Sequence, residues 1–324
     1  MIPLFKPDMP SSEELLPYLR QMDRDKWYSN FGPRLRVFES RLAQHFEVPQ
    51  EQIVTVTSAT VGITVALKSI LAQYKISKEK FTCLIPAWTF VATAQAVLEA
   101  GGKPVFCDVD PKTGAMTPSL VDDYLMNNPK PDVVLPVAPF GASVSVAEWD
   151  HFSDRHDLPV VVDAAASFCA LSAGRCPVVV SLHATKVFGI GEGGVIITSD
   201  AELAESMRKS TTFGFSAGRV ARGPGGNYKL SEYHASVGLA QFDRLGGVVS
   251  RLKEKRVAIV TMLEDIKGIT LLSGEETKIS STLNVIVEKY TAVEVVKILN
   301  NNGIGAGIWW EDVLYQNPVF DFES

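Results

Sequence analysis

Lys186 lies in the part of this sequence whose residue types and spacing are best suited to chemistry. The stretch 181–186, Ser-Leu-His-Ala-Thr-Lys, stands between two apolar runs at 178–180 and 195–197. A charged ammonium on a short turn between buried strands costs several kcal/mol of desolvation, so such a lysine either pairs its charge or has a lowered pKa. A lysine with a lowered pKa can form a Schiff base. The alternative is a lysine on an ordinary surface loop.

Asp163 is a second candidate, because it ends the apolar run 159–162. A carboxylate at the tip of a buried strand needs a cationic or hydrogen-bonding partner. The protonated nitrogen of a pyridine ring is such a partner, and keeping it protonated makes the ring an electron sink. The alternative is an aspartate that caps the following helix.

Small residues at the start of a predicted helix suggest an anion site. Ser58, Ala59 and Thr60 follow the predicted strand 53–57 and open the helix. Backbone N–H groups at a helix N-terminus bind phosphate when small side chains let the anion approach. The alternative is a plain serine N-cap.

These motifs resemble those of the DegT/DnrJ/EryC1/StrS family of pyridoxal-phosphate sugar aminotransferases. The strongest match is Ser-x-His-x-x-Lys at 181–186, followed by Gly-Glu-Gly-Gly at 191–194, with Asp163 upstream. The resemblance extends over residues 2–4, 31–33 and 104–110, continues to Gln241 and reappears near 303–304. It implies an α/β protein of fold type I, with a large, mostly parallel sheet domain, a smaller α+β domain, and homodimers with shared active sites.

The resemblance also implies roles for single residues. Lys186 would hold the cofactor as a Schiff base and transfer a proton, while Asp163 would pair with the pyridine nitrogen. Ser181 would add a hydroxyl to the phosphate site at residues 58–60. His183 would lie close to the cofactor, although a lone histidine is more often structural.

Two further roles are implied by the resemblance alone. Phe90 would stack on the cofactor ring, with Trp88 as the second choice; the alternative is core packing. Asn227, after two glycines, would reach the phosphate of the neighbouring subunit; the alternative is a turn residue. Lys229 stands where the family more often has arginine.

Two departures from the family pattern bear on the pocket. Ala166 occupies the position where the family usually has Gln or His in contact with the cofactor hydroxyl, and the neighbouring Ser167 is the candidate substitute. Family members also usually extend some tens of residues beyond the position matching Ser324.

The implied reaction is transamination of a nucleotide-linked keto sugar, with glutamate as the expected amino donor, in polysaccharide or secondary-metabolite biosynthesis. One alternative is a regulatory or catalytically degenerate relative that binds the cofactor. Another is a pyridoxamine-type sugar dehydratase, but in those enzymes histidine replaces the lysine. The identity of the sugar would depend on the loops at 28–31, 139–142 and 309–310.

The elements that position these residues follow from the apolar pattern. Short β-branched runs alternate with helix-length segments, which predicts a mostly parallel sheet covered on both faces. In such sheets ligands bind beyond the carboxyl ends of the strands, where Ser58, Asp108, Asp163 and Ser181 fall. We expect a large domain at 1–245 and a small domain at 246–324. The strand expected at 282–288 would bury Leu283, Val285 and Val287.

Composition excludes several other functions. The 324 residues carry a net charge of −6 and no basic run, which gives no support for nucleic-acid binding. The N-terminus lacks signal-peptide features and no apolar run has membrane-spanning length, so we expect a cytoplasmic protein. The four cysteines lack metal or disulfide spacing. The glycines at 189–194 lead into a strand, whereas a dinucleotide fingerprint opens a helix.

Overall fold

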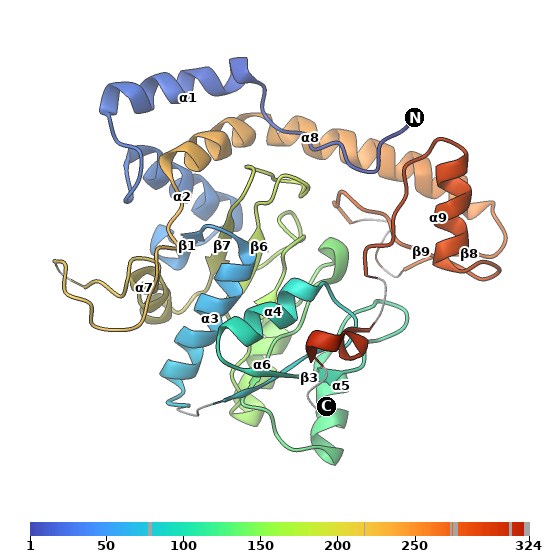
Figure 1. Ribbon diagram of the computed structural model, residues 1–324, viewed down its shortest axis with the longest axis horizontal. Helices are drawn as coiled ribbons and strands as arrows, with labels where there is room; N and C mark the ends of the chain where they lie inside the picture. Colours follow the sequence, from blue (N-terminus) through green and yellow to red (C-terminus); the bar gives the residue numbers. More distant parts are fainter. Residues whose placement is uncertain (77–79, 217, 273, 275–277, 311–312, 321–324) are drawn as a thin grey trace.

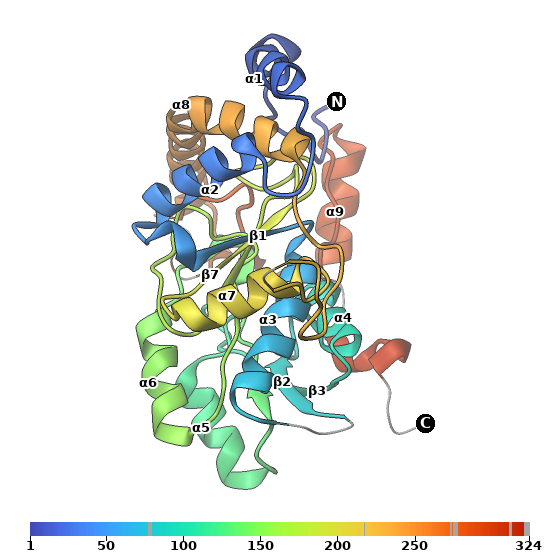
Figure 2. The same ribbon diagram turned by 90° about the vertical axis from the view of Figure 1, so that its left-hand side faces the viewer.

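A twisted sheet with helices on both faces forms the centre of the fold (Figures 1 and 2). The computed structural model describes residues 1–76, 80–216, 218–272, 274, 278–310 and 313–320. The strands of the sheet are β1 (Ile53–Val56), β2 (Thr82–Pro86), β3 (Lys103–Cys107), β4 (Val133–Val134), β5 (Val162–Asp163), β6 (Val178–Ser181) and β7 (Gly194–Ile197).

The sheet is mostly parallel, as the sequence predicted. Its two parts have the orders β3-β2-β4 and β5-β6-β7-β1, and parallel bridges from Val134 to Val160 and from Val137 to Asp163 join them. Only β7 runs antiparallel to its neighbours, β6 and β1. Because β7 lies between them, β1 and β6 are parallel to each other, and their carboxyl ends lie at the same edge as that of β5. This edge holds the candidate residues.

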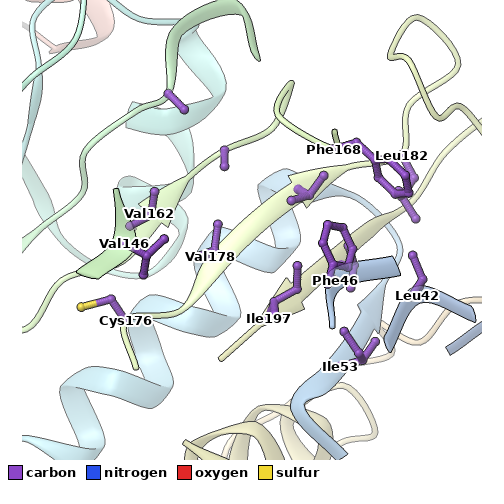
Figure 3. Packing of buried hydrophobic residues seen from close by; sticks show 14 of the residues in the cluster. Leu42, Phe46, Ile53, Val146, Val162, Phe168, Cys176, Val178, Leu182 and Ile197 are labelled. Carbon is purple, nitrogen blue, oxygen red and sulfur yellow. The ribbon is translucent and has the colours of Figure 1, made fainter. Parts of the chain in front are cut away.

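Successive side chains along each strand point to opposite faces of the sheet, so the strands contribute to two hydrophobic cores. Ile53 and Ile197 pack toward one face of the sheet, whereas their neighbours Val54 and Ile196 pack toward the other. Figure 3 shows part of the first core, where Phe46 lies next to Ile197 of β7, and Phe168 and Val178 belong to the same cluster. Long runs of Val and Ile suit these strands, because both of their faces are buried.

The helices divide between the two faces. Those with residues in the first core are α2 (Pro33–Phe46), α5 (Pro118–Asn127), α6 (Val146–His156) and α8 (Glu232–Glu264). Those with residues in the second core are α3 (Ala59–Gln73), α4 (Val91–Glu99) and α7 (Ala201–Ser210). Outside these layers lie α1 (Ser12–Asp25), which packs on α8, and α9 (Ala292–Asn301) beside the hairpin of β8 (Ile269–Leu271) and β9 (Val285–Val287).

The C-terminal part differs from the sequence expectation in two details. Val285 in β9 is 39% exposed, so the prediction that it is buried was wrong. The charge pattern of segment 251–256 predicts an exposed helical face; the segment does lie within the helix α8, but Arg256 is buried and its guanidinium donates hydrogen bonds to the carbonyls of Ser280 and Thr282. The expected boundary between residues 245 and 246 falls inside α8, which is continuous there, and the division into two domains stays a prediction.

Three observations bear on membranes, metals and disulfides, and the first two concern the described residues alone. None of the helices in that part of the chain is both long and apolar enough to span a membrane. Within the same residues no group of His, Cys, Asp and Glu side chains has the arrangement of a metal site. The four cysteines are free thiols, and Cys83, Cys107 and Cys176 are buried.

Candidate active site

Lys186 lies in the connection between β6 and β7, beyond the carboxyl end of β6. The amide of Lys186 donates to the carbonyl of His183 at 2.9 Å, and Gly191 accepts from Ala184 at 2.8 Å. Gly191 has φ +96°, and a Cβ on Gly189 would lie 2.8 Å from the carbonyl oxygen of Ala184, so the turn needs both glycines. The glycines therefore serve to shape the turn that carries Lys186.

The environment of Lys186 favours the neutral amine. Burial lowers its pKa below the ordinary value, and the negative charge of Asp163 partly opposes this change. A partly buried amine with a lowered pKa is suited to act as a nucleophile, and the role of Lys186 stays a prediction.

Asp163 ends β5 and is buried, with 5% of its surface exposed. Its Oδ2 accepts from the Thr93 hydroxyl at 2.8 Å, and its Oδ1 accepts from the Ala165 amide at 3.1 Å. Burial raises the pKa of this carboxyl, while both hydrogen bonds and the charge of Lys186 lower it in part. Two donors fix the carboxylate and still leave lone pairs for a third donor.

The residues of the predicted anion site are brought together around Gly194. Gly194 pairs with Ser181 on one side and with Val56 on the other. A Cβ on Gly194 would lie 2.8 Å from the amide nitrogen of Ala59. Ser181 therefore lies directly across the sheet from Gly194, and Gly194 contacts the start of α3. This arrangement agrees with one anion site formed by Ser181 and the start of α3.

The start of α3 has a serine N-cap and two backbone amides that donate no hydrogen bond within the described residues. The hydroxyl of Ser58 accepts from the Val61 amide at 3.2 Å, so the N-cap interpretation of Ser58 is confirmed. The amides of Ala59 and Thr60 donate no hydrogen bond to any of the described residues, as is usual in the first turn of a helix. These two amides are available to an anion.

Asn227 lies on a segment that runs along the end of β1. The Thr57 amide donates to the carbonyl of Tyr228 at 2.9 Å, which holds this segment beside Ser58. The side chain of Asn227 is exposed and its Oδ1 accepts from the ammonium of Lys229. Its role toward a neighbouring subunit stays a prediction.

Phe90 is the N-cap residue of α4 and its side chain is 45% exposed. Its ring stacks on Trp309, with centroids 6.0 Å apart and planes 16° apart. Trp88 instead packs with Phe140 and Trp310, which are themselves stacked at 4.0 Å. Exposure of Phe90 favours it over Trp88 as the residue that stacks on a bound ring.

His183 and Ser167 make structural contacts. The Nδ1 atom of His183 lies 2.9 Å from the Thr185 hydroxyl, and its Nε2 atom lies 3.6 Å from Glu192. The Ser167 hydroxyl is buried and donates to the carbonyl of Ala142 at 2.9 Å, so it braces the 139–142 loop. This contact gives no support to Ser167 as the replacement for the side chain missing at Ala166.

The sequence did not indicate two supports of the site. Thr93 holds Asp163 from a helix 70 residues away in the sequence, and its hydroxyl also lies 3.1 Å from that of Thr89. The segment 280–282 also packs beside Lys186, because Ser281 donates to the Thr185 carbonyl at 3.1 Å and Ser280 donates to the Phe140 carbonyl at 2.7 Å.

The chain matches the family model of the DegT/DnrJ/EryC1/StrS aminotransferase family over residues 10–324. Protein MT3510 of Mycobacterium tuberculosis is 31% identical over 268 residues, which are 79% of this chain and 62% of that protein. The chain therefore spans less than two thirds of the length of this relative.

Other relatives match over more of their length. The dTDP-4-amino-4,6-dideoxy-D-glucose transaminase of Shigella dysenteriae is 27% identical, over 96% of this chain and 86% of that protein. The crystal structure of DesI in the presence of its TDP-sugar product has a TM-score of 0.84 at 26% identity, and the match covers 97% of this chain and 81% of DesI. These similarities confirm the expected fold.

Proposed function

Since this chain belongs to the DegT/DnrJ/EryC1/StrS aminotransferase family, we propose that it transfers an amino group to a keto sugar carried on a nucleotide. The family uses pyridoxal phosphate, and relatives named as sugar transaminases support the substrate class. Glutamate as amino donor and a homodimer with shared sites belong to the same proposal. The cytoplasmic location remains a prediction from the sequence.

The observation that carries the proposal is the placement of Lys186 and Asp163. Both lie beyond the carboxyl ends of parallel strands, the amine with a lowered pKa and the carboxylate fixed by Thr93 and the Ala165 amide. A nucleophilic amine beside a buried carboxylate is the pair that an aldehyde on a pyridine ring requires.

The residues present fit pyridoxal phosphate. Asp163 is a buried carboxylate with no ion pair among the described side chains, which suits a cationic ring nitrogen as its remaining donor. At the other end, the amides of Ala59 and Thr60 and the hydroxyl of Ser181 suit a phosphate. The exposed ring of Phe90 suits a stacked aromatic ring.

The proposed chemistry assigns each residue a task. When bound, pyridoxal phosphate supplies an aldehyde and a conjugated ring that accepts electrons. Asp163 keeps a proton on the ring nitrogen, because its charge stabilises a neighbouring cation in a buried place. Lys186 would hold the cofactor and, once its amine is released, Nζ would accept a proton from the substrate carbon that bears the amino group and donate it to the carbon that carried the aldehyde of the cofactor. The 280–282 segment keeps the lysine turn in place through Ser281 and the Thr185 carbonyl.

Two other functions fit less well. A pyridoxamine-type dehydratase of this family has histidine in place of the lysine, and this chain has Lys186. A regulatory relative that binds the cofactor without turnover would use the same lysine, and Ala166 removes one contact with the cofactor that the family usually makes, but relatives named as transaminases favour an enzyme. Turnover with an amino donor separates an enzyme from such a relative.

The test combines spectroscopy with chemical mapping. The purified protein loaded with pyridoxal phosphate should absorb visible light, and borohydride followed by peptide mapping should label Lys186. Lys186→Ala should lose this label, whereas Lys209→Ala should keep it, because Lys209 lies on α7 and pairs with Glu205 at 3.3 Å. Glutamate should bleach the visible band of the wild type, and a nucleotide-linked keto sugar should restore it. Labelling of a different lysine would contradict the site.

A further inference from the structure

The N-terminal segment, residues 2–8, lies against the chain that leads into Trp309 (Figure 1). The amide of Ile2 donates to the Gly303 carbonyl at 2.8 Å, and the Gly305 amide donates to the Ile2 carbonyl at 2.7 Å. A Cβ on Gly305 would lie 2.6 Å from the amide nitrogen of Leu4, so glycine alone permits this approach. Backbone hydrogen bonds and this close approach therefore join the two segments.

Phe5 extends this contact to the active site. Its ring packs on Trp309, with centroids 5.0 Å apart and planes 59° apart. Trp309 in turn stacks on Phe90, the residue proposed to cover the cofactor ring. A cavity of about 290 Å³ borders Phe90, Trp309 and Trp310. Trp309 therefore lines a cavity next to Phe90.

Asp8 fixes the other end of the segment to α8. Its carboxylate accepts from Arg244 at 2.5 Å and from Arg251 at 2.7 Å, and its carbonyl accepts from Gln241 at 3.2 Å and from Arg244 at 3.3 Å. Burial raises the pKa of Asp8, but hydrogen bonds from Arg251 and Arg244 outweigh it, so the pKa is lowered. The carboxylate is thus charged at neutral pH and joined to two arginines.

We propose that residues 2–8 form a brace between α8 and Trp309, and that Asp8 is a positioning residue for the keto sugar substrate. The inference rests on the proposed function, because it assigns the cavity beside Phe90 and Trp309 to that substrate. Within the described residues, Asp163 and its support Thr93 make no hydrogen bond to the brace. Loss of the brace should therefore weaken sugar binding and leave the reaction with glutamate intact.

The experiment compares Asp8→Asn with Asp8→Glu and with a matched control, Asp154→Asn. Asp154 is also an exposed aspartate paired with an arginine, Arg175, at 2.7 Å, on α6. Hydrogen exchange of the protein loaded with pyridoxal phosphate reports directly on the Gly305 amide. In Asp8→Asn, exchange of the peptide 303–310 should be about tenfold faster, since charge-assisted hydrogen bonds are lost. Asp8→Glu should restore part of the protection.

Kinetics then test the positioning role. Asp8→Asn should raise KM for a nucleotide-linked keto sugar by about tenfold, with the glutamate half-reaction and the visible spectrum unchanged. Phe5→Leu should raise the same KM without faster exchange at Gly305, because it removes the ring contact and leaves Asp8 in place.

Three results would overturn the inference. The first is an unchanged exchange rate of the 303–310 peptide in Asp8→Asn. The second is an exchange rate that rises as much in Asp154→Asn as in Asp8→Asn. The third is faster exchange in Asp8→Asn together with an unchanged KM for the keto sugar. If wild-type protein fails to react with glutamate, the proposed function is refuted, and the exchange experiment alone decides whether Asp8 holds the segment.

Discussion

Replacement of Asp163 by asparagine tests the electrostatic part of the proposed site. The substitution keeps the size of the side chain and removes its charge. One oxygen can still accept from the Ala165 amide, but the amide nitrogen cannot accept from the Thr93 hydroxyl, which lies 2.8 Å from Oδ2. The buried charge beside the ring nitrogen is lost, and with it the stabilisation of a cation there.

The size of the effect follows from the burial of this carboxylate. Two unit charges about 4 Å apart are worth about 4 kcal/mol at an effective dielectric constant near 20. The dipole of the asparagine amide keeps part of this stabilisation. We therefore expect the activation free energy of proton transfer to rise by about 3 kcal/mol, which slows the step roughly a hundredfold. The cofactor should still bind, because the phosphate site at residues 58–60 is unchanged.

The assay is the single-turnover reaction with glutamate, followed by absorbance. Thr93→Val, which removes one hydrogen bond to Asp163, should slow the reaction by roughly tenfold. Asp110→Asn is the matched control, because Asp110 accepts from the Lys112 and Thr113 amides in a turn outside the site. Rates for Asp163→Asn equal to those of Asp110→Asn would refute the role of Asp163 near the ring nitrogen.

Three further predictions concern other parts of the molecule. In the protein without cofactor, the pH midpoint for labelling of Lys186 by an amine reagent should lie below the ordinary range of lysine, since burial lowers the pKa of Lys186; Asp163→Asn should lower that midpoint further, because it removes the negative charge that favours the ammonium. Mixing inactive Lys186→Ala and Asn227→Asp subunits should restore roughly a quarter of wild-type activity if sites are shared across the dimer, and no recovery after verified exchange would mean that Asn227 acts within its own subunit. Glu232→Ala should destabilise the protein by about 2–4 kcal/mol in urea unfolding, because the Glu232 carboxylate accepts from the Arg34 and Leu35 amides at 2.8 and 3.0 Å and caps α2.

The sequence predicted the parts of the site that depend on local pattern. Apolar runs placed the ends of β1, β5 and β6 to within one residue, and because these strands are parallel, Ser58, Asp163 and Ser181 lie at one edge. The glycines after Lys186 indicated a turn for the same local reason.

Contacts between distant segments could not be predicted in this way. Nothing near Thr93 indicates that its hydroxyl would reach Asp163, and nothing near Phe90 indicates that Trp309 would stack on it. The prediction that Val285 in β9 is buried was wrong for a related reason. Alternation predicts which residues share a face, but only packing against a second layer buries that face, and Val285 and Ile286 remain 39% and 45% exposed.

The position of α8 has a consequence for synthesis of the chain on the ribosome. The first two helices, α1 and α2, pack on α8, and Tyr18 donates to Asp243, which follows it by 225 residues. At about 5–20 residues per second, translation separates these partners by roughly 10–45 seconds. The apolar residues Leu35, Phe38 and Leu42 of α2 thus emerge long before the helix that covers them. Folding of this protein is completed from its C-terminal half, after most of the sheet has been made.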